Sequence, residues 1–301
     1  MKKANKLMPI APGHRACAGC GQMIAARAVA ESLGENVIIA NATGCLEVTT
    51  TPYPESSWGL PWIHSLFENA AAVASGIRAS LNHQGKNRKA VKVVAQGGDG
   101  GTFDIGFGLI SGMWERGDDV LYICYDTEAY SNTGIQASGS TPWAAATTTT
   151  PAGIGRSIDA IGSHQVKKDM VGIALAHGLK YVAETTAGFP LDIAAKVKKA
   201  LSMEGPSYIQ ILSPCVPGWK HDSSQTVKMG KLAAQTGLYP VLEYVEGRLS
   251  SVQKVPRPQI KVDEYLKAQA RFSHLFKTER GREEIGRIQK QADANIQKFG
   301  L

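Results

Sequence analysis

The stretch Gly97-Gly98-Asp99-Gly100-Gly101-Thr102 follows an apolar run, Val91 to Ala95, and forms a glycine-rich turn after it. Glycine tolerates positive φ and has no side chain in the way, so backbone amides in such a turn can approach a phosphate closely. Phosphate oxygens would repel Asp99 unless a hard divalent cation lay between them. The segment predicts a diphosphate held through a metal ion, although alone it is equally well a tight turn.

A second polar loop strengthens the diphosphate interpretation. The stretch from Asp126 to Gly134 follows another apolar run, Val120 to Tyr125, and its Thr127 and Asn132 offer neutral oxygens. Both loops can leave the carboxyl ends of neighbouring parallel strands, where open α/β sheets bind ligands.

Composition is typical of a soluble protein with one large or two modest domains. The 301 residues are 43% hydrophobic and 20% charged, and no apolar run has the length of a signal peptide or membrane span, so we expect a cytoplasmic protein. The net charge of +7 is scattered, with a surplus in the last forty residues, which argues against nucleic acid as a partner. A basic rim would attract an acidic partner such as a small electron carrier.

The order of apolar segments predicts a doubly wound, mostly parallel α/β sheet, because short buried strands alternate with amphipathic helices. We expect strands at 37–40, 91–95, 120–125, 181–185 and 208–212, and helices at 22–33, 67–81, 104–116, 167–177 and 190–202. In the helix at 104–116, Ile105, Leu109, Ile110 and Met113 are expected to face inward. Residues 49–63 and 134–166 are expected to be long functional loops. Residues 240–262 are expected to form a hairpin or extended arm, and 263–298 a charged helical tail.

Four of the five cysteines lie at loop positions suited to metal ligation. Cys17 and Cys20 precede a helix, Cys45 sits in a glycine turn, and Cys215 lies between two prolines. Four thiolates indicate either an iron-sulfur cluster or tetrahedral zinc, which spacing does not separate; alternatively Cys45 and Cys215 are ordinary buried thiols. Cys124, in the middle of a predicted strand, is expected in the core.

Six motif groups together are highly specific. They are Gly13-His14-Arg15 with Cys17-Ala18-Gly19-Cys20-Gly21; Ala42 to Glu47; Pro61 to His64 with Phe67-Glu68-Asn69; Gly98 to Thr102; Tyr130 to Gly134; and Ser213-Pro214-Cys215. Through them, nearly the whole chain resembles the β subunits of pyruvate:ferredoxin oxidoreductases, also called pyruvate synthases, in the 2-oxoacid:ferredoxin oxidoreductase family. The resemblance implies a sheet of the thiamine diphosphate-binding type.

The resemblance also implies a set of site residues. Thiamine diphosphate would be bound through Mg²⁺, with Asp99, the Thr127 hydroxyl and the Ala129 carbonyl as metal ligands. A proximal 4Fe-4S cluster would be held by Cys17, Cys20, Cys45 and Cys215. Asn132 would face the reacting substrate as a catalytic hydrogen-bond donor. The other expected cofactor-binding residues are Thr43, Gly44, Cys45, His64, Gly98, Gly100, Gly101 and Thr133; a histidine in a loop is more often structural, which is the alternative for His64.

The implied reaction is oxidative decarboxylation of pyruvate to acetyl-CoA and CO₂, with electrons passed to ferredoxin. Residues 1–220 would form the domain that binds thiamine diphosphate, Mg²⁺ and the cluster, and residues 221–301 an arm and helix for subunit contacts. The α subunit would supply a cofactor-activating glutamate and substrate-binding groups, and γ- and δ-type subunits would carry further 4Fe-4S clusters. The chain alone would be inactive.

Departures from the family pattern leave undecided which 2-oxoacid is the substrate. Trp143 and Ala144 stand where pyruvate enzymes usually have a smaller residue and glycine, and Ser131 replaces a methionine common in the separate-subunit enzymes. Oxalate, oxidised to CO₂ without coenzyme A, is therefore an alternative substrate. Two further alternatives are a non-redox thiamine-dependent decarboxylase subunit with structural zinc, and an assembly or electron-relay subunit without a thiamine site.

Overall fold

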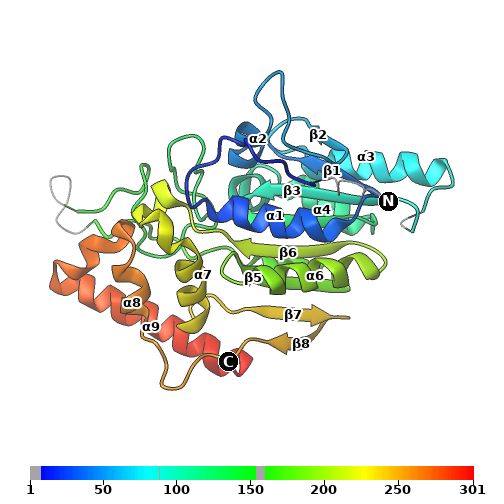
Figure 1. Ribbon diagram of the computed structural model, residues 1–301. Helices are drawn as coiled ribbons and strands as arrows, with labels where there is room; N and C mark the ends of the chain where they lie inside the picture. Colours follow the sequence, from blue (N-terminus) through cyan, green and yellow to red (C-terminus); the bar gives the residue numbers. More distant parts are fainter. Residues whose placement is uncertain (1–7, 88, 154–159) are drawn as a thin grey trace, which may run out of the picture.

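An eight-stranded sheet forms the centre of the computed structural model, which describes residues 8–87, 89–153 and 160–301 (Figure 1). Its strand order is β2-β1-β3-β4-β6-β5-β7-β8; the first six run parallel, β7 pairs antiparallel with β5, and β8 pairs antiparallel with β7. The strands are β1 (Val37–Asn41), β2 (Trp62–His64), β3 (Lys92–Gly98), β4 (Leu121–Asp126), β5 (Tyr181–Thr186), β6 (Ser207–Leu212), β7 (Leu242–Val245) and β8 (Arg248–Val252). The predicted α/β sheet, mostly parallel, is confirmed.

Helices cover both faces of the sheet, because strands buried on two sides need an apolar layer on each. On one face, α1 (Gly21–Leu33) and α6 (Pro190–Ser202) pack into one core cluster. On the other face, α3 (Ala70–His83), α4 (Phe107–Glu115) and α5 (Met170–Ala176) pack into a second cluster. Every residue of β4 and β6 is buried between these layers.

The helix predicted at 104–116 has a different phase from the one expected. A π-helical turn, η1 (Gly100–Asp104), precedes α4, so the α-helical register starts only at Phe107. Ile110 and Met113 are fully buried as expected, whereas Ile105 is 54% and Leu109 36% exposed. The inward assignment of Ile105 and Leu109 was therefore wrong.

Two other local expectations also need correction. The predicted loop at 49–63 contains the edge strand β2, which pairs with β1 through Ile39 and Trp62. The helix expected from residue 167 begins at Met170, where the Asp169 side chain accepts a hydrogen bond from the Gly172 amide at the helix start. Both shifts are local and leave the sheet order intact.

The C-terminal part packs against loops at the carboxyl ends of the strands. The β7–β8 hairpin, expected from the sequence, joins the main sheet beside β5. The remaining elements are α2 (Cys45–Thr50), α7 (Thr226–Gln235), α8 (Val262–Lys267), α9 (Glu279–Phe299), and the short helices η2 (Val216–Lys220), η3 (Ser223–Gln225) and η4 (Ala270–Phe276). Figure 1 shows α7, α8 and α9 grouped beside the sheet, and they form a third core cluster that includes Ala144, Ala145 and Trp219.

A boundary between two domains at residue 220 stays a prediction. Among the described residues, no helix combines the length and the apolar character needed to span a bilayer.

Two alanine substitutions at neighbouring positions of α4 test which side of this helix faces the core. Replacing Ile110 by alanine removes a fully buried side chain, so we expect a loss of about 2–5 kcal/mol in the free energy of unfolding. Leu109→Ala, one position away on the exposed side, should cost no more than about 1 kcal/mol. Denaturant titration of both variants decides this, and equal losses would contradict the observed helix phase.

Candidate functional site

Two hydrogen bonds join the loops that follow β3 and β4. The carboxylate of Asp99 is fully buried, and its Oδ1 accepts hydrogen bonds from the Thr127 amide at 3.1 Å and the Thr127 hydroxyl at 2.9 Å. Because β3 and β4 are adjacent and parallel, their carboxyl ends lie at the same edge of the sheet. The two loops are thus in direct contact.

The Ala129 carbonyl completes a cluster of oxygen atoms. It accepts a hydrogen bond from the Thr127 hydroxyl at 3.1 Å and a longer one from the Ser131 hydroxyl at 3.4 Å. The second carboxylate oxygen of Asp99 accepts from the Ser138 hydroxyl. A carboxylate, a hydroxyl and a carbonyl therefore converge, and these are the oxygen ligands that Mg²⁺ takes in proteins.

The Asp99 carboxylate is electrostatically costly in this position. Burial and the nearby Asp126 carboxylate raise the pKa of Asp99 to about 7, although hydrogen bonds from Ser138 and Thr127 oppose the shift. A bound cation would offset both causes, because opposite charge favours the ionised carboxyl. The site therefore suits a divalent cation on this observation as well as on its oxygen atoms.

A cavity of about 90 Å³ lies beside Asp99. Gly100 is essential to its shape, since a Cβ there would lie 2.4 Å from the Tyr130 ring. Eight residues predicted to bind the cofactor line it: Thr43, Gly44, Cys45, Gly98, Asp99, Gly100, Asn132 and Thr133, as do Thr127 and Ala129. The remaining lining residues, which were not predicted to bind the cofactor, are Gln22, Asn41, Ala42, Leu46, Phe67, Gly97, Tyr130 and Ser131.

Two predicted residues stand outside this lining. His64 contacts it indirectly, through a 2.7 Å hydrogen bond between its Nε2 and the Thr43 hydroxyl. Gly101 is buried in η1, where a Cβ would lie 3.2 Å from the Phe67 carbonyl. Gly101 thus allows η1 to pack against the segment before α3.

A second cavity, of about 240 Å³, is lined by Cys17, Cys20, Cys45 and Cys215. Cys17 and Cys20 precede α1, Cys45 begins α2, and Cys215 follows β6. Four residues from three distant parts of the sequence therefore surround one space. Cys124, by contrast, is fully buried in β4, as expected of a core residue.

Gly21 makes the approach of two of these cysteine segments possible. Its amide donates a hydrogen bond to the Pro214 carbonyl at 3.1 Å, and a Cβ on Gly21 would lie 2.6 Å from that same oxygen. The start of α1 can therefore pack directly against the residue that precedes Cys215.

The thiols in this cavity need positive charge to ionise. Burial raises the pKa of Cys20 and Cys215, and it raises that of Cys45 to about 12; charge repulsion among these cysteines adds to each shift. Metal coordination reverses this, because a coordinating thiol is deprotonated by the metal.

The cysteines surround the space without meeting at one point. Among the residues the structure describes, no three His, Cys, Asp or Glu side chains are grouped closely enough to hold a single metal ion.

The two cavities share a wall. Gln22, Cys45, Leu46, Thr127, Ser131 and Asn132 line both of them. Asn132, the predicted catalytic residue, is solvent-exposed and stands between the two spaces. A group bound at the cysteines would thus adjoin one bound beside Asp99.

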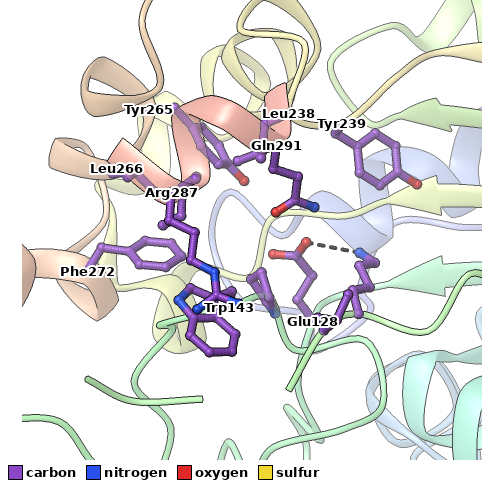
Figure 2. Close-up of a pocket in the computed structure, with 13 residues that line it drawn as sticks. Glu128, Trp143, Leu238, Tyr239, Tyr265, Leu266, Phe272, Arg287 and Gln291 are labelled. Atoms are coloured by element: carbon purple, nitrogen blue, oxygen red, sulfur yellow. Dashed lines mark hydrogen bonds and ion pairs between the residues drawn. The ribbon is translucent and has the colours of Figure 1, made fainter. Parts of the chain in front are cut away.

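Trp143, one of the departures from the pattern of pyruvate enzymes, lines a third cavity of about 140 Å³ (Figure 2). Its indole Nε1 donates to Glu284 Oε2 at 2.7 Å, and the Arg287 guanidinium lies 3.8 Å from its ring centroid. Both partners are on α9. Trp143 therefore contacts the C-terminal helix and is absent from the lining of the first two cavities.

Comparison with protein families and curated proteins agrees with this geometry. Residues 42–211 match the family described as "Thiamine pyrophosphate enzyme, C-terminal TPP binding domain". The chain is 51% identical over 301 residues to pyruvate synthase subunit PorB of Methanosarcina barkeri, covering all of both chains. It is 39% identical to ketoisovalerate oxidoreductase subunit VorB of Pyrococcus abyssi, covering 88% of this chain and 85% of that one.

A solved structure shares the fold. It is a 2-oxoglutarate:ferredoxin oxidoreductase from Magnetococcus marinus with 2-oxoglutarate, coenzyme A and succinyl-CoA bound. The match has a TM-score of 0.57 at 24% identity and covers 85% of this chain and 88% of the other.

The close packing at Gly21 is testable by one added methyl group. Gly21→Ala should destabilise the chain by about 1–3 kcal/mol, because its Cβ would overlap the Pro214 carbonyl. Gly76→Ala is the matched control, since that helical glycine has nothing within 4 Å of an added Cβ. It should be neutral or stabilising by about 1 kcal/mol. Thermal unfolding that ranked the two variants in the opposite order would contradict the described contact.

Proposed function

The chain belongs to the PorB family of pyruvate synthase subunits, and from this premise we propose that it binds thiamine diphosphate, Mg²⁺ and a 4Fe-4S cluster for the oxidative decarboxylation of pyruvate. The observation that carries the proposal is the shared wall between the Asp99 cavity and the four-cysteine cavity. It would place an electron acceptor beside the cofactor that generates the electrons.

The residues present fit a metal-bound diphosphate. Asp99, the Thr127 hydroxyl and the Ala129 carbonyl would hold Mg²⁺, and the glycine turn would leave room for the diphosphate. When bound, thiamine diphosphate supplies the nucleophilic carbon and the electron sink for cleavage of the 2-oxoacid. Asn132 would donate a hydrogen bond to the oxygen of the substrate on which negative charge develops.

The residues also fit an iron-sulfur cluster. Cys17, Cys20, Cys45 and Cys215 line one cavity of about 240 Å³, which shares a wall with the Asp99 cavity. A redox cluster at this place would accept electrons from the cofactor, whereas zinc would only stabilise the fold, and this favours a 4Fe-4S cluster and a redox enzyme over a decarboxylase with a structural metal. Electrons would leave through this cluster toward ferredoxin by way of partner subunits.

Exposed apolar side chains support an α subunit that covers this side of the molecule. Tyr53 is 97% exposed, and Ile63 and Leu66 are also exposed. Ile63 and Leu66 lie on either side of His64 in the sequence, and His64 forms a hydrogen bond with Thr43 in the cavity lining. A group of exposed apolar residues often marks a protein interface. We propose that the α subunit completes the site here and that γ- and δ-type subunits carry the remaining clusters.

Pyruvate is the substrate we propose, because the relatives at 51% identity are named for it. The placement of Trp143 against α9 also removes it from direct contact with the cofactor cavity. Anaerobic assay of the intact complex with pyruvate, 2-oxobutyrate, 2-oxoglutarate and oxalate, with and without coenzyme A, tests this. Pyruvate turnover should require coenzyme A, and oxalate turnover without it would replace pyruvate by oxalate.

Two cysteine variants, one in the four-cysteine cavity and one in the core, test the proposed ligands of the cluster. In anaerobically purified complex, Cys45→Ala should lose the iron and acid-labile sulfide of one cluster, because one of four ligands is gone. Cys124→Ala, which changes a cysteine in the core of β4, should retain both. Iron and sulfide analysis decides, and equal contents in the two variants would refute the assignment to Cys45.

The raised pKa of Asp99 predicts how Mg²⁺ affinity depends on pH. The metal binds the ionised carboxylate, and without metal the pKa is about 7, so protons compete with Mg²⁺ below that pH. Affinity measured with thiamine diphosphate present should fall toward about tenfold for each pH unit below the pKa. Asp99→Asn should abolish binding throughout. Wild-type affinity that stays constant between about pH 8 and about pH 5.5 would count against Asp99 as a ligand.

A further inference from the structure

We propose that the C-terminal segment η4 positions the metal-binding loop through Arg271, with Lys167 as its second support. The inference rests on the proposed function, since it concerns the loop that contains Thr127 and Ala129. Arg271 lies in η4, 142 positions beyond Ala129 in the sequence. Neither Arg271 nor Lys167 belongs to the cofactor cavity.

The backbone of Glu128 is strained, so the loop needs stabilising contacts. It lies between the two proposed metal ligands and has a φ of 60°, in the left-handed region that costs a residue other than glycine about 1 kcal/mol or more. This conformation turns the Glu128 side chain away from its neighbours' ligand atoms and into the protein, where it is only 5% exposed. Favourable contacts of that side chain must offset the strain.

Two cations supply those contacts. Arg271 Nη2 lies 2.6 Å from Glu128 Oε2, and Lys167 Nζ lies 3.0 Å from Glu128 Oε1. Lys167 Nζ also lies 2.6 Å from Asp126 Oδ2. Figure 2 shows Glu128 with its dashed ion pair beneath the residues of α8 and α9. Two buried carboxylates thus face two cations, so removal of either cation leaves an uncompensated buried charge.

Hydrogen bonds hold the carbonyls of Thr127 and Glu128, and the Ala129 carbonyl is the one proposed to bind the metal. The Thr127 carbonyl accepts from Trp219 Nε1 at 2.9 Å, and the Glu128 carbonyl accepts from the Thr141 hydroxyl at 2.9 Å. The Ala129 carbonyl accepts from the nearby Thr127 and Ser131 hydroxyls and lies in the cavity beside Asp99. The two anchored carbonyls fix the orientation of the third.

Arg271 contacts both Trp219, which holds the Thr127 carbonyl, and the side chain of Glu128. Its guanidinium carbon lies 4.0 Å from the Trp219 ring centroid, while its Nη2 binds Glu128. Arg271 Nε donates to Gln269 Oε1 at 2.8 Å, which fixes the side chain from its own segment. One arginine therefore connects the C-terminal segment to the carbonyl of Thr127 through Trp219 and to Glu128 directly.

The test is Mg²⁺ affinity of the intact complex after removal and re-addition of Mg²⁺ and thiamine diphosphate. Arg271→Gln should raise the Mg²⁺ dissociation constant at least about tenfold, as is typical when a residue that orients metal ligands is changed. Arg271→Lys, which keeps the charge, should recover part of this loss. Cluster iron should be unchanged in both, which separates a loop effect from general damage.

A matched arginine provides the control. Arg287 is also in the C-terminal region and also stacks on a tryptophan, Trp143, at 3.8 Å, yet it is exposed, whereas Arg271 is buried against Glu128. Arg287→Gln should leave the Mg²⁺ dissociation constant within about twofold of the wild type. An equal loss in the Arg287 and Arg271 variants would overturn the proposal.

A milder variant keeps the test decisive if Arg271→Gln fails to assemble. Thr141→Val removes the hydroxyl that holds the Glu128 carbonyl and should raise the dissociation constant severalfold without burying a charge. Unchanged Mg²⁺ affinity in a folded Arg271 variant, or in Thr141→Val when no Arg271 variant folds, would overturn the positioning role. If the wild-type complex itself shows no Mg²⁺-dependent binding of thiamine diphosphate, the proposed function fails instead.

Discussion

The buried carboxylate of Asp99 is the constraint on which the site depends. Its two hydrogen bonds from Thr127 connect the loops of β3 and β4, and the side chain is fully buried. Burial of a carboxylate without a cation is unfavourable, as the raised pKa of Asp99 indicates. The same arrangement that costs free energy in the metal-free protein would be relieved by the divalent cation that we propose.

A similar balance recurs around Asp99. The half-buried Cys45 and Cys215 have pKa values above their usual range and suit a positively charged metal centre. Behind the loop, Lys167 and Arg271 compensate Asp126 and Glu128 within the protein itself. In the proposed function, bound cofactors would compensate the groups on the cavity side of the loop, whereas Lys167 and Arg271 compensate the carboxylates behind it.

Much of the fold was predictable because the central strands are continuous apolar runs. Val120 to Tyr125 could only be a buried segment, and the polar loop after it had to lie at the sheet edge. The short strand β2 was missed because it has three residues at the edge of the sheet, and α4 was misphased by the π turn before it. Motifs in the sequence singled out Asp99, Thr127 and the four cysteines, which line two adjoining cavities, and their roles stay predictions. Arg271 was not, since its contact with Glu128 spans 143 positions and only packing creates it.

The placement of metals tests the central claim most directly. Diffraction from the anaerobically prepared complex, recorded on both sides of the iron absorption edge, would show where iron lies relative to Cys17, Cys20, Cys45 and Cys215. We predict a multinuclear iron peak bonded to all four sulfurs, with a diphosphate-bound Mg²⁺ between Asp99 and Ala129. A single zinc ion at the cysteines, or a diphosphate bound away from Asp99, would contradict it.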